Sequence, residues 1–177
     1  WMPACLVEEV LEPDGPPVRV RLLGRNYVAF RDSEGRVGIL DEQCPHRRAS
    51  LVYGRNEEGG LRCLYHGWKF DVRGCVLEMA TEPPSSGMAG KVRHQAYPVR
   101  EWGGMVWVYL GPAETEPEFT PPPWAPSPDV RVSIAKAVVD IYGGYITAQS
   151  PGRSLGSTFE VRLPLAELEG GVFQPVR

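Results

Sequence analysis

Two short segments of this chain each carry one cysteine and one histidine. The first is Cys44-Pro45-His46, and after sixteen further residues it is followed by Cys63-Leu64-Tyr65-His66. The whole chain has only four cysteines and three histidines among 177 residues, so half or more of each type lies in this one window. The chain between the two segments is long enough to form a hairpin that places them face to face. The pattern therefore predicts a metal site that the fold must assemble.

Four ligands of these types hold either a zinc ion or a binuclear iron-sulfur cluster. Two ligands of one tetrahedral zinc ion are usually separated by two or more residues, because the chain between them must turn around the ion. Only one residue separates Cys44 from His46, which favours ligands on two different metal atoms. In a Rieske centre two cysteines bind one iron and two histidines bind the other. We expect a [2Fe-2S] cluster at Cys44, His46, Cys63 and His66, with a zinc-binding structural domain as the alternative.

The histidines also predict how such a cluster behaves. Because neutral imidazoles replace two thiolates, the oxidised cluster is less negative and its reduction potential is higher than that of an all-cysteine cluster. An exposed imidazole edge is a short exit for an electron, so both histidines are expected to face the surface. Rieske proteins of respiratory complexes have an extra, disulfide-bonded cysteine in each loop. Ala49 and Tyr65 stand at those places, which favours the soluble kind of lower potential.

Short extended runs separated by turn residues make up the first two-thirds of the chain. Twenty glycines and eighteen prolines interrupt the sequence, and no useful helical period occurs before residue 130. The pattern predicts a mainly β fold, an antiparallel β-sandwich or small barrel. The expected strands are 18–22, 27–31, 37–41, 61–64, 68–71, 97–101 and 105–110, with a hairpin connection at Asp32-Ser33-Glu34-Gly35.

The composition changes twice toward the C-terminus. Seven prolines lie between Pro112 and Pro128, as expected of an extended linker or a crossover along the surface. Apolar spacing then predicts one amphipathic helix at 132–142, which ends at Gly143-Gly144, and a hairpin follows. The expected organisation is a first domain at 1–111, a Pro-rich linker at 112–129 and a tail of a short helix plus β-hairpin at 130–177, the hairpin strands being 145–149 and 157–163.

The overall charge argues against several classes of function. With 22 acidic and 19 basic residues the net charge is −3, so the chain has no basic excess that would indicate nucleic-acid binding. No apolar run is long enough to span a membrane. The chain has no recognisable secretory leader and too few cysteines for a disulfide scaffold, so a cytoplasmic location is expected. The first residue, Trp1, indicates a processed or truncated product, and an oligomer remains compatible with all of this.

Residues 44–71 resemble the N-terminal Rieske domain of aromatic-ring-hydroxylating oxygenases of the phthalate dioxygenase and vanillate demethylase type. The flanking segments 13–24, 82–84 and 91–98 fit as well, and the resemblance covers residue 1 to about 123. It implies a Rieske-type antiparallel β-sandwich with a cluster-binding subdomain. It also implies a domain that accepts electrons from a reductase or ferredoxin and passes them to a mononuclear non-haem iron, where an aromatic compound is hydroxylated or demethylated.

The catalytic iron of that family is expected to lie in a domain or subunit outside this chain. Such an iron needs two histidines and a carboxylate. Only His94 remains once the cluster ligands are subtracted, so this chain cannot build the site alone. The resemblance is thus to an oxidoreductase class, and whether the chain is itself an enzyme stays open.

One position departs from the family. Two residues after the first histidine ligand, where a glycine is usual, this chain has Arg48, which is expected to crowd the cluster or to require a backbone angle that arginine disfavours. Near the ligands, Trp68 is expected to pack over the cluster or in the core, and Tyr65 to donate a hydrogen bond to sulfur or to lie on the surface. His94 is expected at a structural or surface position, with a contact to a redox partner as the alternative. Cys5 and Cys75 are expected to be free thiols.

The tail resembles a second family. Residues 133–150, Gly152 and 156–165 resemble the closing helix and hairpin of the histidine-kinase ATPase domain. A nucleotide site of that kind needs an asparagine on an upstream helix and a glycine-rich lid, whereas Asn26 and Asn56 both lie in the Rieske part. We therefore expect no ATPase activity. The tail is either a helix-hairpin that covers part of the Rieske domain or part of a truncated or fused fragment, with or without a signalling role.

Overall fold

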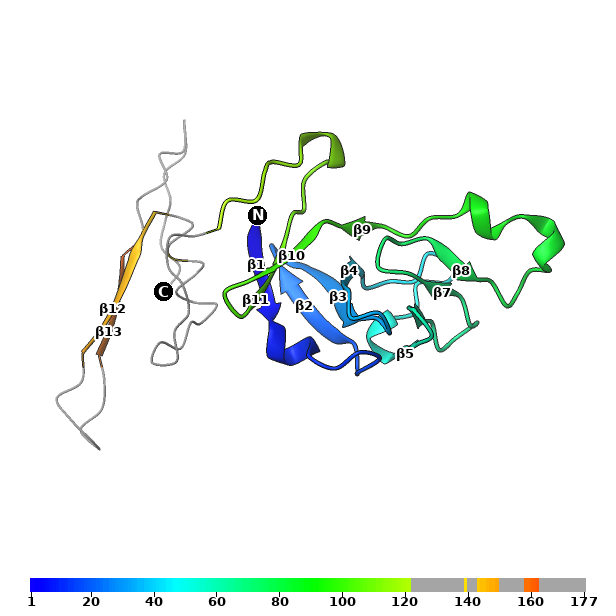
Figure 1. Ribbon diagram of the computed structural model, residues 1–177, viewed down its shortest axis with the longest axis horizontal. Coiled ribbons are helices and arrows are strands. Elements are labelled where there is room, and N and C mark those ends of the chain that lie inside the picture. Colours follow the sequence, from blue (N-terminus) through cyan, green and yellow to red (C-terminus); the bar gives the residue numbers. More distant parts are fainter. Residues whose placement is uncertain (122–138, 140–142, 150–157, 163–177) are drawn as a thin grey trace. The chain divides into compact units, whose positions relative to one another are not determined.

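The computed structural model describes residues 1–121, 139, 143–149 and 158–162, and for 146–149 and 158–161 the backbone alone (Figure 1). The chain forms two compact units, Trp1–Ile134 and Ala135–Arg177. In the second unit β12 (Tyr145–Gln149) and β13 (Thr158–Arg162) pair as an antiparallel hairpin. The strand at 145–149 has the predicted bounds, and β13 lies within the expected 157–163.

Three antiparallel sheets make up the first unit (Figure 1). The first consists of β1 (Met2–Leu6), β11 (Met105–Val108) and β10 (Val99–Trp102), in that order. The central sheet consists of β2 (Val18–Leu22), β3 (Arg25–Arg31), β4 (Val37–Asp41) and β9 (Ala96–Tyr97). The third consists of β5 (Arg55–Glu57), β6 (Gly60–Arg62), β7 (Lys69–Phe70) and β8 (Val76–Glu78). Short 3₁₀ turns lie between them: η1 (Val7–Val10), η2 (Leu51–Tyr53), η3 (Pro84–Ser86), η4 (Ala89–Lys91) and η5 (Ala113–Thr115).

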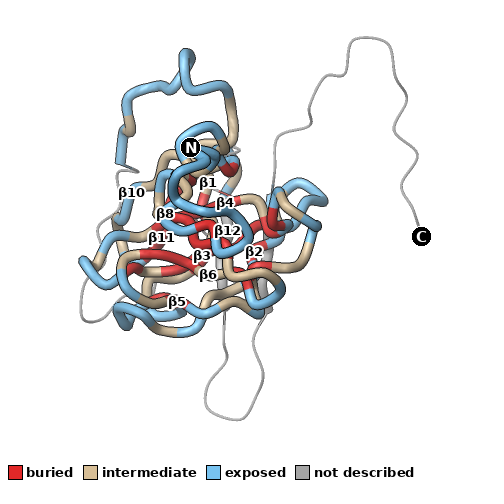
Figure 2. The backbone as a smooth tube through the Cα atoms, turned by 90° about the vertical axis from the view of Figure 1, so that its right-hand side faces the viewer, coloured by how far each residue is buried: buried red, intermediate tan, exposed pale blue. Residues whose placement is uncertain are grey.

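The central sheet is buried on both faces, which explains the unbroken apolar run in β3. Successive side chains of a strand point to opposite faces of the sheet. Tyr27 and Ala29 therefore pack in one core with residues of β1 and β11. Val28 and Phe30 pack in a second core with residues of β6 and β7. In Figure 2 buried stretches of the backbone gather around β3. This second core also contains Cys44 and Cys63, so the packing that stabilises the sandwich also positions the candidate ligands.

The hairpin connection expected after β3 is present. The carboxylate of Asp32 is fully buried and accepts the backbone N–H groups of Glu34 and Arg36 at 3.0 and 2.8 Å. Gly35 has a φ of +80°, a left-handed conformation that glycine adopts without a Cβ penalty. The Asp32 side chain thus replaces the backbone hydrogen bonds that the turn interrupts.

The mainly β fold is confirmed, and the strands at 18–22 and 37–41 have the predicted bounds. The single strand expected at 97–101 is instead divided into β9 and β10, because Pro98 has no N–H to donate to a ladder. Three strands were not predicted: β1, β5 and β8. Each is short, and its sequence does not alternate between apolar and polar residues. Pairing with a neighbouring strand therefore makes it a strand.

Most of the helix predicted at 132–142 lies outside the described residues. Val139 is helical and buried, and the N–H of Gly144 donates to its carbonyl at 2.9 Å. Gly143 has a φ of +68°, the left-handed conformation that commonly follows a helix. Gly143 and Gly144 themselves are not helical, and residues 140–142 lie outside the described residues. In the described part of the chain, no helix has the length and apolar character to cross a membrane.

The described part of the Pro-rich segment, residues 112–121, packs against the first sheet. The indole N–H of Trp1 donates to the carbonyl of Pro117 at 2.9 Å. The ring of Phe119 lies 5.3 Å from that of Trp1 and 5.7 Å from that of Trp107. Residues 112–121 therefore run along the surface, as expected of a crossover. Residues 122–129 lie outside the described residues.

Candidate metal centre

Two loops carry the cysteine-histidine pairs, and each is closed by its own backbone hydrogen bonds. We call residues 43–50, which follow β4, the first loop, and residues 63–68, between β6 and β7, the second loop. In the first loop the N–H of Cys44 donates to the carbonyl of Ala49 at 2.9 Å, and the N–H of Arg48 donates to the carbonyl of Cys44 at 2.8 Å.

The second loop repeats this pattern at the same offsets. The N–H of Cys63 donates to the carbonyl of Trp68 at 2.8 Å, and the N–H of Gly67 donates to the carbonyl of Cys63 at 3.0 Å. Each cysteine thus begins a loop of the same design. The histidines differ by one position, because His46 lies two residues after its cysteine and His66 lies three after.

The fourth residue after each cysteine has a left-handed backbone. Gly67 has a φ of +72° and Arg48 a φ of +59°. An L side chain in this conformation costs about 1 to 2 kcal/mol. Of the two consequences expected for Arg48, the structure shows the disfavoured backbone angle. The side chain lies on the exposed side of the loop, where its Nε donates to Oε1 of Gln43 at 3.0 Å.

Both cysteines are buried in the apolar core beneath the loops. Cys44 is 2% exposed and Cys63 is 3% exposed, and both pack with residues such as Leu51 and Leu61. Desolvation by burial raises the pKa of the Cys44 thiol to about 11, although hydrogen bonds from the backbone of His46 act in the opposite direction. A neutral Cys44 thiol is therefore favoured when no metal compensates the charge.

Both histidines are half-buried and lie beside one another. The ring centroids of His46 and His66 are 4.7 Å apart. The indole of Trp68 stacks on His46, and the exposed ring of Tyr65 lies 3.8 Å from His66. Partial desolvation, followed by the charges of His66 and Arg47, lowers the pKa of His46. The rings therefore reach the surface, as expected, while the sulfur atoms do not.

One atom of this arrangement has no partner within the protein. Nδ1 of His46 is buried and makes no hydrogen bond. Buried polar atoms of this kind are nearly always paired, so an unpaired imidazole nitrogen beside two buried thiols fits a metal-bound group. In the part of the chain that the structure describes, no three His, Cys, Asp or Glu side chains are grouped as around one ion.

The other residues singled out from the sequence lie apart from the ligands or play supporting roles. His94 is buried, its Nε2 lies 2.8 Å from the carbonyl oxygen of Asp41, and burial lowers its pKa, so its role is structural. Cys5 and Cys75 are free cysteines, as expected, and burial raises the pKa of Cys5 to about 12. Trp68 both contacts a candidate ligand and belongs to the core.

Sequence reasoning missed a polar support under the second loop. Nη1 of Arg62 donates to the carbonyl of Gly67 at 3.1 Å, and Nη2 lies 2.9 Å from a carboxylate oxygen of Glu78. Lys69 is 3% exposed, and its Nζ contacts Glu78 and also Glu58, the latter at 3.2 Å. A lysine next to Phe70 in a buried strand is the signal that could have indicated this network.

A second support, also missed, ties the first loop to the central sheet. The nearly buried carboxylate of Glu42 accepts hydrogen bonds from Nη2 of Arg19 at 2.6 Å and from Oγ of Ser50 at 2.5 Å. The hydrogen bonds from Arg19 hold the pKa of Glu42 below its usual value, which burial alone would raise. Glu42 directly precedes the first loop, and its carboxylate bonds the last residue of that loop, Ser50.

Comparison with known families identifies this pair of loops. Residues 1–102 match the Rieske [2Fe-2S] domain family. The chain belongs to that family. A Rieske domain implies a [2Fe-2S] cluster, which confirms the expected cofactor and argues against the zinc alternative.

Relatives of this Rieske domain are oxygenase subunits. The phthalate 4,5-dioxygenase oxygenase subunit of Pseudomonas putida is 65% identical over 139 residues, which are 78% of this chain and 32% of that protein. The 3-chlorobenzoate-3,4-dioxygenase oxygenase subunit of Comamonas testosteroni is 50% identical over 119 residues, 67% of this chain and 27% of that protein. The chain thus spans about a third or less of the length of these relatives.

Solved structures show the same fold. A crystal structure of dicamba monooxygenase bound to 3,6-dichlorosalicylic acid aligns with a TM-score of 0.58 at 29% identity, over 69% of this chain and 35% of that one. The oxygenase of carbazole 1,9a-dioxygenase, solved in complex with ferredoxin, aligns with a TM-score of 0.54 at 30% identity, over 70% of this chain and 30% of that one. The Rieske-oxygenase type of fold expected from the sequence is therefore confirmed.

The resemblance of the tail to a histidine-kinase ATPase domain is not supported. The family that matches there, over residues 108–149, is described as LigXa C-terminal domain like. The resemblance rests on a few glycines and on apolar spacing within one short helix-hairpin, and such a pattern is weak evidence over so short a segment.

Proposed function

We propose that Cys44, His46, Cys63 and His66 bind the [2Fe-2S] cluster, with the cysteines at one iron and the histidines at the other. The observation that carries this assignment is the repeated loop design. Two loops with the same backbone hydrogen bonds bury one thiol each and place two imidazoles side by side, one of them with an unpaired Nδ1. When bound, such a cluster takes up and releases one electron at a time.

The surrounding residues have separate tasks in this proposal. The apolar core around Cys44 and Cys63 excludes water from the sulfur ligands. Backbone groups of the first loop hydrogen-bond the sulfur of Cys44, which stabilises a thiolate there. Trp68 covers one face of His46, and Arg62 holds the carbonyl of the second loop. The half-buried imidazole edges remain the route between the site and a partner.

We further propose that the chain is the electron-transfer part of an oxygenase system that acts on aromatic compounds. It would receive electrons from a ferredoxin or reductase and deliver them to a non-haem iron that residues of this chain do not form. The names of its relatives and the ferredoxin complex of a similar oxygenase support this. The 177 residues offer only His94 as a further histidine, and that side chain is buried against a backbone carbonyl.

Metal analysis and spectroscopy of the purified chain test the ligand assignment. We expect equal amounts of iron and acid-labile sulfide, a visible spectrum that dithionite bleaches, and an electron paramagnetic resonance signal in the reduced state. Cys63→Ser should lose iron and colour, whereas Cys75→Ser, a matched change of a free cysteine outside both loops, should keep them. A colourless chain that carries only zinc would contradict the proposal.

Turnover assays test whether this chain transfers electrons without itself oxidising an aromatic substrate. With a suitable reductase and NAD(P)H, the chain should become reduced without hydroxylating an aromatic acid such as phthalate. Aromatic product formed by this chain and reductase alone would show that an iron site exists that the histidine count excludes.

A further inference from the structure

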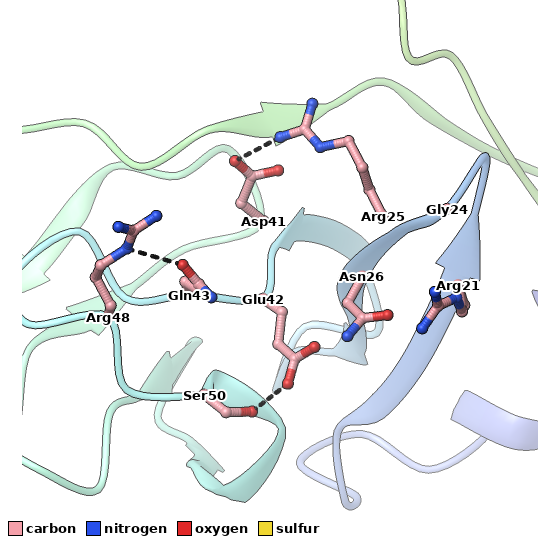
Figure 3. Close-up of a pocket in the computed structure, with 9 residues that line it drawn as sticks. All are labelled: Arg21, Gly24, Arg25, Asn26, Asp41, Glu42, Gln43, Arg48 and Ser50. Carbon is pink, nitrogen blue, oxygen red and sulfur yellow. Dashed lines mark hydrogen bonds and ion pairs between the residues drawn. The ribbon is translucent and has the colours of Figure 1, made fainter.

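A polar hollow of about 470 Å³ opens beside the first loop (Figure 3). The β2–β3 hairpin contributes Arg21 and Arg25 to its wall, and the first loop contributes Arg48. Arg47, the neighbour of His46, is also exposed. We call these four residues, Arg21, Arg25, Arg47 and Arg48, the arginine surface.

The acidic residues of the hollow neutralise only part of this surface. Glu42 is almost fully buried and is already bonded to Arg19. It also accepts a hydrogen bond from Ser50, which Figure 3 shows. Asp41 pairs only with Arg25, at 3.6 Å, and also accepts a hydrogen bond from Tyr97.

Among the described residues, three of the four arginines have no acidic partner. The described residues provide no ion pair for Arg21 or Arg47, and the Nε of Arg48 donates to a neutral amide. The chain as a whole has a net charge of −3, so this basic surface is a local feature and not a consequence of composition.

The backbone of Arg48 is a second, independent sign that this side chain has a task. The equivalent position of the second loop is Gly67, which adopts the same left-handed conformation without strain. Arg48 adopts it at a cost, and its side chain lies in the hollow. Strain of this kind is characteristic of residues whose side chains serve a function.

The arginine surface borders the candidate path of the electron. Arg47 and Arg48 directly follow His46, whose ring lies 4.7 Å from that of His66. Leu64 and Tyr65 of the second loop are 60% and 61% exposed, and the ring of Tyr65 lies 3.8 Å from that of His66. An apolar patch with a charged rim is the usual composition of a protein interface, and the charges mainly raise the association rate and determine the orientation.

We infer that the arginine surface docks a carboxylate-rich surface of the protein that donates electrons to this chain. The inference rests on the proposed function. In the docked pair one electron leaves the reduced centre of the donor, which is oxidised, and enters the oxidised cluster, which is reduced; no bond forms or breaks. The donor is thus an acidic one-electron carrier, and its carboxylates would meet Arg21 and Arg48 across the hollow.

Stopped-flow reduction of the full chain by a plant-type [2Fe-2S] ferredoxin, an acidic carrier, tests the inference. Arg21→Glu and Arg48→Glu should each lower the second-order rate constant roughly tenfold at low ionic strength, and the difference should shrink as salt screens the charges. Arg73→Glu is the matched control, because it makes the same change of charge at an exposed position in the turn between β7 and β8. Its rate constant should stay within about twofold of the unmodified chain.

Arg21→Glu keeps the test valid if the strained Arg48 variant fails to assemble a cluster, because Arg21 lies on β2 outside both loops. Equal rate constants for Arg21→Glu and Arg73→Glu, or rates that salt does not change, would overturn the inference. The inference would also be overturned if the substitutions changed the rate of reduction by the small anion dithionite but not the rate of reduction by ferredoxin. A chain without the visible spectrum of a cluster would overturn the proposed function as well, whereas a normal spectrum with equal rates would overturn the docking inference alone.

Discussion

The imidazole of His46 lies flat on the indole of Trp68, with ring centroids 4.6 Å apart and planes 3° from parallel. The indole is itself held in place, because its Nε1–H donates to Oγ1 of Thr81 at 2.9 Å. A residue of the second loop therefore determines the orientation of a candidate ligand in the first loop. The two loops are coupled through this stack in addition to any metal they share.

Removal of the stack should loosen the centre. For Trp68→Leu we expect a loss of about 0.5 to 1.5 kcal/mol of aromatic contact, which corresponds to a roughly two- to tenfold faster loss of the cluster. Thr81→Val keeps the stack but removes the hydrogen-bond acceptor, so its effect should be smaller. The decay of visible absorbance in a chelator measures both. Equal decay rates for Trp68→Leu and the unmodified chain would show that the stack does not stabilise the site.

The two left-handed positions should respond in opposite directions to substitution. Arg48→Gly relieves the backbone strain and should stabilise the fold by about 0.5 to 1 kcal/mol. Gly67→Ala introduces strain at a φ of +72°, and its Cβ would lie 3.2 Å from that of Ala80, so we expect destabilisation by about 1 to 2 kcal/mol. Urea unfolding measures both, and a stabilising Gly67→Ala would contradict the assigned conformation.

Glu42 should make the first loop sensitive to acid. Its pKa is lower in the folded chain than the usual 4.5, so its contribution to the free energy of unfolding is present above pH 4.5 and is lost as the pH falls through the lowered value. Glu42→Gln should cost about 1 to 2 kcal/mol at neutral pH and flatten this dependence. Unfolding curves from about pH 3 to pH 7, which cover the range in which carboxylates titrate, measure how the free energy of unfolding changes with pH. An unchanged slope would exclude Glu42 as its source.

His94 should add a second pH dependence at higher pH. Burial lowers its pKa below 6.5, so between 6.5 and the lowered value the unfolded chain binds a proton that the folded chain does not. The free energy of unfolding should therefore decrease as the pH falls below 6.5, and the contribution should be fully present above it. His94→Gln retains an N–H donor for Asp41 and should abolish this part of the slope. A slope that persists in the variant would have to come from another group.

The candidate ligands could be predicted from the sequence because their types and spacing are local properties of two short segments. The same holds for β2 and β4, whose apolar runs are bounded by turn residues. β1 could not be predicted, because its only support is pairing with β11, close to the other end of the first unit. The interpretation of the tail was wrong because a short helix-hairpin pattern carries too little information to identify a family.

The sequence by itself determined the candidate donor set of the metal centre and the β character of the fold, since both depend on neighbouring residues. Only the tertiary structure decided that Trp68 covers His46, that His94 is buried, and that Arg48 shares a hollow with Arg21. Each of these relationships joins segments distant along the chain. Such contacts are individually weak and are selected together by the packing of the whole domain, so no local pattern specifies them.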